Sequence, residues 1–249
     1  MNLINLNIWG GILFSPLMDF FHSQKSRIDI FCLQEVWDHR LASEEGLKKA
    51  PRGTRVDILS HLIDSLAGFQ VFFAPAQDNA EGVAFFVKNG IKIDHQGDVF
   101  VFRSRDSMVE NDGKTLGRNL QFIQFKKGGE AYTVCHFHGL WTGDGKGDTP
   151  SRIDQSKKIK SFLKSVQGSK KILCGDFNLL PETQSIKILE DGMRNLIKEY
   201  GIRSTRNDYY QKKDPYADYV FVSGEVNVKS FRTLPVAVSD HLPLYLEFF

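Results

Sequence analysis

The sequence has little cysteine and no cysteine pattern. It carries three cysteines in 249 residues. Cys32, Cys135 and Cys174 each stand inside an apolar run, as small buried hydrophobic side chains do. No CxxC pair or regular spacing indicates a zinc cluster or a disulfide framework. The thiols therefore predict a reducing compartment, and we expect a cytoplasmic protein.

Long apolar runs and a strong charge imbalance are also missing. No stretch of about 18 apolar residues is present, so no membrane span is expected. The N-terminal segment lacks the basic region of a signal peptide. The formal net charge of +2, from 32 basic and 30 acidic residues, neither requires nor excludes a nucleic-acid partner. We expect a monomer.

Strand-like segments dominate what is present, and many of them alternate apolar with polar residues. They are residues 2–9, 27–34, 69–75, 82–88, 98–102, 119–125, 131–137, 170–176, 218–223, 226–231 and 242–248. Helices are predicted from Ser15-Pro16, with Ser15 as the N-cap, over 55–66 and 149–166, and after Pro181. This mixture predicts an α+β fold in which two sheets pack face to face with helices outside, as one domain over 1–249.

Two polar loops are longer than a tight turn, at residues 103–117 and 142–148. Long loops beside a rigid scaffold tend to be functional or mobile. The second loop reads TGDGKGD, and its Lys146 would either bind phosphate oxygens or belong to a flexible segment.

The segment KKILCGDFNL at 170–179 is a buried strand that ends on a glycine and a polar pair. Asp176 and Asn178 are two residues apart, so in a strand their side chains would project to the same side. Asp and Asn also form Asx turns by bonding nearby backbone. This segment alone is compatible with either a chemical site or a turn.

Other strand ends repeat the pattern of polar, metal-capable side chains. They are Asn7, Glu35, His136, His138, Asp176, Asn178, Asp218, Asp240 and His241. Each has a plain structural explanation alone, such as a turn, a surface acid or a core histidine. Such a coincidence at six strands of one domain is much less probable than at one, so the set indicates a shared site.

The ordered motifs LNIW, LQE, a strand ending in His, GDFN, ADYVFV and SDH resemble those of the endonuclease/exonuclease/phosphatase superfamily. Its members include apurinic endonucleases, deoxyribonucleases, deadenylases, sphingomyelinases and inositol-polyphosphate phosphatases. The resemblance spans residues 2–249. It implies a four-layer α/β/β/α sandwich of two mixed sheets, with the site at one edge of the sheets.

The resemblance also implies roles for the strand-end residues. Glu35 would be the main ligand of a Mg²⁺ ion, or of Mn²⁺, with Asn7 and Asp240 close by. Asp176 would orient and deprotonate the attacking water. Asn178 would hold that water or the developing charge. His241 would contact the phosphate, with Asp218 bonded to its other ring nitrogen, and His138 would be a second phosphate contact. Arg118 would support the site.

Two features qualify this picture. Several nucleases of the superfamily carry an acid two residues after the first-strand Asn, where this chain has Trp9. A weaker or single-metal site is the natural interpretation. His136 and His138 form an HxH pair that could hold zinc, but no third His or Cys ligand with suitable placement is evident.

The sequence favours a metal-dependent phosphoester hydrolase whose substrate is a nucleic acid. Trp141 would stack on a base or cover the core edge, beside a lysine-rich helix. The alternative is a phosphatase or phosphodiesterase of a small soluble or lipid-derived ester. A non-catalytic binding module on the same scaffold is disfavoured, because every residue that the chemistry needs is present.

Overall fold

The computed structural model describes residues 1–48, 50–77, 80–104 and 117–249. Most of the polar loop predicted at 103–117 lies outside the described residues. Two six-stranded sheets form the centre of the molecule. The first has the order β11-β12-β1-β2-β4-β3 and the second β5-β6-β7-β8-β10-β9.

The strands of the first sheet are β1 (Asn2–Asn7), β2 (Ile30–Trp37), β3 (Phe69–Gln77), β4 (Glu81–Lys88), β11 (Val228–Thr233) and β12 (Leu244–Phe248). Those of the second are β5 (Ile93–Phe102), β6 (Arg118–Lys127), β7 (Glu130–His138), β8 (Lys170–Asp176), β9 (Arg194–Asn195) and β10 (Asp218–Val222). The helices are α1 (Phe14–Gln24), α2 (Glu44–Lys48), α3 (Ile58–Ser65), α4 (Pro150–Ser165), α5 (Gln184–Glu190) and α6 (Leu196–Glu199), with a 3-10 turn at Trp9–Gly11.

The two sheets share one pattern of neighbours. β1 pairs in parallel with β2, and β7 pairs in parallel with β8, whereas the other pairs are antiparallel. A helix connects each parallel pair, α1 in the first sheet and α4 in the second. The carboxyl ends of parallel strands lie at one edge, where ligands bind in open α/β sheets. In both sheets, polar residues at the carboxyl ends of the parallel strands therefore lie at the edge where a ligand could bind.

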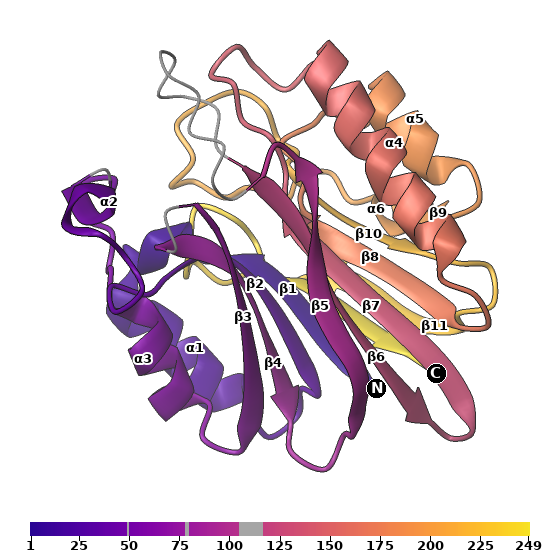
Figure 1. Ribbon diagram of the computed structural model, residues 1–249, viewed down its shortest axis with the longest axis horizontal. Helices are drawn as coiled ribbons and strands as arrows, with labels where there is room; N and C mark the ends of the chain where they lie inside the picture. The colour runs from indigo at the N-terminus through magenta and orange to yellow at the C-terminus, as the bar shows by residue number, and fades with distance from the viewer. Residues whose placement is uncertain (49, 78–79, 105–116) are drawn as a thin grey trace.

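Helices cover the outer faces, as the sandwich prediction requires. In Figure 1, α1 and α3 lie beside the first sheet and α4 and α5 beside the second. The buried core between the sheets includes Cys32 and Phe85 from one sheet and Val134 and Val220 from the other. A separate buried cluster packs α1 and α3 on the first sheet. The predicted fold class is confirmed.

The helix predictions differ in accuracy. Thr149 caps α4, where its side chain accepts a hydrogen bond from the Arg152 backbone N–H, and Pro150 begins the helix as expected. The predicted N-cap at Ser15 is wrong. α1 begins at Phe14 after Leu13, and Ser15 lies inside its first turn. The first turn tolerates a proline because its N–H groups have no helical partners. No helix in the described parts of the chain is long and apolar enough to cross a membrane.

Candidate active site

The side chain of Asn7 joins the two sheets at the end of β1. Its Nδ2 donates to Glu35 Oε1 at 2.9 Å and to Asp176 Oδ2 at 3.0 Å. Its Oδ1 accepts a hydrogen bond from the Trp9 backbone N–H at 2.9 Å, which fixes the orientation of the amide. The residues predicted at three different strand ends are therefore in direct contact.

Strained backbone surrounds these contacts. Among the described residues other than glycine, four have positive φ: Trp9, Glu35, Arg103 and Asn178. The φ of 58° at Glu35 falls where the register of β2 shifts against β4, and that of Asn178 is 54°. Left-handed backbone at a non-glycine residue is uncommon and gathers at functional sites. The irregularity after Leu33 interrupts the strand where Glu35 meets Asn7.

Asp176 ends β8 and takes part in both of the arrangements that its sequence suggested. Its Oδ1 accepts a hydrogen bond from the Asn178 backbone N–H at 2.8 Å, which is an Asx turn. Its Oδ2 faces Asn7. Gly175, which precedes it, has a φ of 143°, and a Cβ there would lie 2.1 Å from the Phe137 carbonyl oxygen. Only glycine permits this close approach of β7 to β8.

His241 and Asp218 form a buried pair beside Asp176. His241 Nδ1 lies 2.8 Å from Asp218 Oδ2, and its Nε2 lies 3.5 Å from Asp176 Oδ2. Burial opposes the charge on His241, but the carboxylates of Asp218 and Asp176 outweigh it and raise the pKa of the imidazole. The Thr205 hydroxyl accepts hydrogen bonds from the backbone N–H groups of Ala217 and Asp218, which positions the start of β10.

His138 approaches Asp176 from the other side. Its Nε2 lies 3.8 Å from Asp176 Oδ2 and 3.9 Å from Glu35 Oε1. Its Nδ1 lies 3.5 Å from the carboxylate of Glu81, which also faces Arg118 Nη1 at 3.9 Å. The sequence analysis missed Glu81. The predicted strand at 82–88 began one residue too late, and an acid at the start of β4 is the signal that would have found it.

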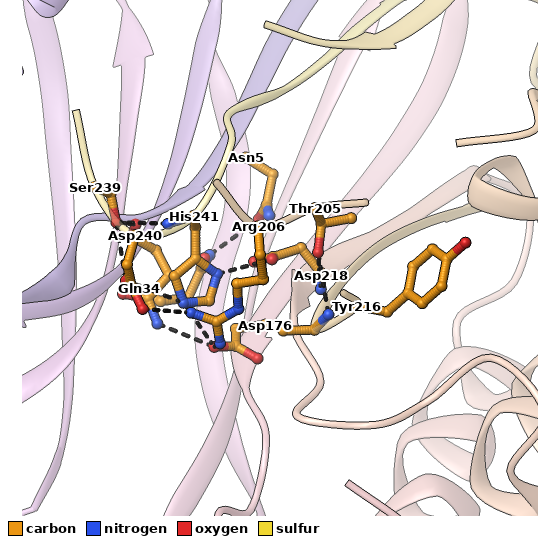
Figure 2. Close-up of polar contacts among 12 residues, drawn as sticks. Asn5, Gln34, Asp176, Thr205, Arg206, Tyr216, Asp218, Ser239, Asp240 and His241 are labelled. Carbon is orange, nitrogen blue, oxygen red and sulfur yellow. Dashed lines mark hydrogen bonds and ion pairs between the residues drawn. The ribbon is translucent and has the colours of Figure 1, made fainter. Parts of the chain in front are cut away.

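Arg206 is the second functional residue that the sequence analysis missed. Its Nη1 donates to Asp240 Oδ2 at 2.6 Å, and its Nη2 lies 4.0 Å from Asp176 Oδ2 (Figure 2). The guanidinium carbon lies 4.1 Å from the centroid of the Tyr210 ring. Arg206 belongs to an irregular polar segment between α6 and β10, where no periodic pattern marks a buried position.

Comparison with known proteins is consistent with this geometry. The model of the endonuclease/exonuclease/phosphatase family matches residues 4–241. The chain belongs to this family. No curated protein sequence matches the chain.

Three solved structures illustrate the fold. The Bacteroides thetaiotaomicron mannosyl-6-phosphatase Bt3783 is 18% identical with a TM-score of 0.77, covering 100% of this chain and 99% of that one. Danio rerio TDP2 with single-strand DNA product is 15% identical with a TM-score of 0.72, covering 100% and 98%. The human Nocturnin catalytic domain is 21% identical with a TM-score of 0.64, covering 100% and 93%. At these identities the likeness shows the fold, and family membership supports phosphoesterase activity.

Charges in this endonuclease/exonuclease/phosphatase site are unevenly balanced. Burial alone would raise the pKa of Asp176, but the basic groups around it, His241, His138, Arg206 and Lys146, lower it well below its usual range. Glu35 has the opposite balance. Burial raises its pKa and nearby Glu81 adds to the effect, although His138 opposes it. A further cation beside Glu35 would stabilise its charged form.

The residues fit a hard divalent ion on the Glu35 side. Carboxylate and amide oxygens suit Mg²⁺, and Asn7 Oδ1 keeps a lone pair after accepting from Trp9. Asp176, Asp218 and His241 offer donor atoms within 4.8 Å of one another. His241 Nδ1 is hydrogen-bonded to Asp218 and its Nε2 faces Asp176 at 3.5 Å, so the imidazole lies between the two carboxylates.

The three residues predicted to bind substrate lie at different places. Arg118 is buried and begins β6, where its guanidinium faces Glu81 as described above. Lys146 is also buried; its Nζ donates to the Tyr216 carbonyl oxygen at 2.6 Å and lies 4.9 Å from the Tyr210 ring. Burial, and next Arg206, lower its pKa to about 8. Trp141 is exposed, and Lys212 Nζ lies 5.2 Å from its ring.

Proposed function

We propose that this protein is a divalent-metal-dependent phosphoester hydrolase in which Asp176 directs water in line onto phosphorus, and that its favoured substrate is a nucleic acid. One observation carries the proposal. Asp176 Oδ2 accepts from Asn7 and faces His241, His138 and Arg206 at 3.5, 3.8 and 4.0 Å. An anion in this position is fixed and ionised, as the residue that orients a nucleophilic water must be.

The reaction is a simple exchange of bonds. A water oxygen would form a bond to phosphorus while the bond to the ester oxygen breaks on the opposite face. The proton of the water would pass to Asp176 as charge leaves the nucleophile, and the departing oxygen would take a proton from solvent. Because its pKa is low, Asp176 would contribute mainly by orientation. Asn178, whose Nδ2 lies 3.4 Å from the Gly139 carbonyl oxygen, would help to hold the same water.

The two histidines would bind the phosphate. His241 carries a raised pKa and donates from Nδ1 to Asp218, so its Nε2–H would be available as a charged donor. His138 has Glu81 behind its Nδ1 and directs Nε2 toward the same carboxylate, Asp176. Charge-assisted hydrogen bonds are roughly twice as strong as neutral ones. Together they would stabilise the equatorial charge of the transition state.

Glu35 and Asn7 would hold a Mg²⁺ or Mn²⁺ ion. When bound, such an ion supplies positive charge that polarises a phosphate oxygen and stabilises the leaving group. Asp240, the third predicted ligand, is paired with Arg206.

Two substrate classes are supported by different observations. The exposed ring of Trp141 beside Lys212 resembles the combination of aromatic and basic groups that binds single strands. The TDP2 structure of the same fold holds a single-strand DNA product. A small phosphate ester is the second candidate, because the mannosyl-6-phosphatase Bt3783 has the higher TM-score of the two.

A labelled duplex with one abasic site and one single-stranded overhang separates these classes. We expect Mg²⁺-dependent cutting that EDTA and Asp176→Asn abolish, with fragment lengths that identify the site of attack. Release of inorganic phosphate from sugar and inositol phosphates without any cutting would move the assignment to small esters. If the wild-type protein, shown by circular dichroism to be folded, neither cut the duplex nor released phosphate from the small esters, the proposed hydrolysis would be contradicted.

A further inference from the structure

Arg206 is built into the centre of the site. Its side chain is 8% exposed. The guanidinium lies between Asp240 and Asp176, as Figure 2 shows, and the Tyr210 ring packs against it. Nη1 donates to Asp240. Nη2 stays 4.0 Å from Asp176, which is too long for a hydrogen bond, so its N–H groups remain available to a ligand oxygen on that side.

The backbone holds Arg206 in register with the catalytic segment. Arg206 and His241 form an isolated antiparallel bridge, and the Leu242 backbone N–H donates to the Thr205 carbonyl oxygen at 2.9 Å. Asn207 adds a side-chain hydrogen bond to the Ser239 carbonyl oxygen at 2.7 Å. The position of the guanidinium therefore depends on the same backbone contacts that position His241.

The carboxylates of the site differ in how close their basic partners lie. Asp218 has His241, Glu81 has Arg118, Asp240 has Arg206, and Asp176 is surrounded by several positive groups. Glu35 Oε1 accepts a hydrogen bond from the neutral Asn7 amide at 2.9 Å and lies 3.9 Å from His138 Nε2.

We propose that Arg206 is a fixed cation that engages Asp240, so that the site accepts one divalent ion, on the Glu35 and Asn7 side, and uses the guanidinium as its second positive charge. This inference rests on the proposed function. Coordination by Asp240 Oδ2 would require breaking a buried 2.6 Å ion pair, and breaking buried pairs is costly. Asp240 Oδ1 accepts from the Ser239 hydroxyl at 3.4 Å and lies 3.7 Å from His241 Nε2. Unlike a second metal ion, the guanidinium stays in place when a chelator is added.

Mn²⁺ binding measured by electron paramagnetic resonance tests this without any substrate. We expect one bound Mn²⁺ per wild-type chain. In Arg206→Gln and Arg206→Met, the charge that repels a divalent ion is gone and Asp240 is released. Mn²⁺ should then bind about tenfold more tightly or at a second site, while an Arg206 with only a structural role predicts weaker binding on its removal.

Arg206→Lys and Arg194→Gln are matched controls. The first keeps the charge and should bind Mn²⁺ nearly as the wild type does. The second removes a half-buried arginine that is paired with Glu199, in the β9 strand. Two bound ions in the wild type would overturn the inference even if no variant folds. Unchanged or weaker binding in both neutral variants would also overturn it. Because the measurement needs no turnover, it separates this inference from a wrong assignment of the reaction.

Discussion

Two layers of buried polar side chains lie between the same pair of sheets, and they differ in charge. His138 belongs to the charged layer, where it faces the carboxylates of Glu81, Glu35 and Asp176. His136, two residues earlier on β7, meets amides. Its Nε2 lies 2.8 Å from Gln121 Oε1 and its Nδ1 lies 3.2 Å from Gln34 Nε2.

The contrast shows that the partner, rather than the residue type, decides what a buried histidine does. Burial among neutral amides lowers the pKa of His136 to about 3, so this ring stays uncharged. Gln121 also donates to the Phe72 carbonyl oxygen on the edge strand β3, so the neutral layer joins the sheets. Both ring nitrogens of His136 face amides, which leaves none for the zinc that the HxH pair suggested.

The largest expected effect comes from the charged layer. Asp176→Asn should reduce kcat/KM by about 10³-fold or more, because it removes the anion that orients the water. Steady-state kinetics on the substrate that the duplex and phosphate-release assays identify measures the loss. Asp154→Asn on the exposed face of α4 is the control. A variant of Asp176 that kept a tenth of the activity would contradict the assignment.

Asp218→Asn should change the pH profile as well as the rate. His241 has a raised pKa, so the protonated form persists until the pH rises through that value. Removing the Asp218 carboxylate lowers this pKa, and the alkaline limb of kcat/KM should move to lower pH with a loss of about 10–100-fold in rate. A limb that does not move would show that His241 is not the charged donor.

The neutral layer should affect stability without an effect on the chemistry. The unfolded chain binds a proton on His136 near pH 6.5, and the folded one only near pH 3. Stability is therefore lost as the pH falls from about 6.5 toward 3, by up to about 1.4 kcal/mol per pH unit. Denaturant unfolding of His136→Gln should show a shallower loss in acid, and about 1–3 kcal/mol less stability at pH 7. Equal acid slopes in the two proteins would contradict this.

The smallest effect is expected beyond both layers. Trp141→Ala changes an exposed ring, so the free energy of unfolding should stay within about 0.5 kcal/mol. If the ring stacks on a base, KM for a single strand should rise several-fold while kcat stays constant. An equal KM for both proteins would leave Trp141 out of the binding surface.

Strand-end residues were predictable because strands of one sheet bring their ends together. Asn7 and Asp176 end apolar runs and Asp218 begins one, which the sequence displays clearly, and the structure places the three at one edge. Arg206 could not be found this way. It lies in a polar segment without periodicity. Its burial depends on contacts with Asp240, which is 34 positions away, and with Tyr210 in the same irregular segment.

Short elements and exact boundaries were also beyond the sequence pattern. β9 spans only two residues, and α6 four, so neither shows a period. The amide layer is hidden for another reason. Gln34 and Gln121 look like ordinary polar positions in alternating strands. Gln121 lies opposite His136 in the same sheet, and Gln34 faces that buried ring from the other sheet. Tertiary context overrides the local pattern at such positions.

The first and last strands are neighbours in the middle of one sheet. β12 pairs with β1 from Asn2 opposite Glu247, and the Ser239 hydroxyl donates to the Asn7 carbonyl oxygen across 232 positions of sequence. Contacts of such long range carry a large loop-closure cost and tend to slow folding. Asn7 and His241 therefore become neighbours only when the two ends of the chain have met. Catalytic activity would then appear only when folding is complete, and a partly folded chain would be inactive.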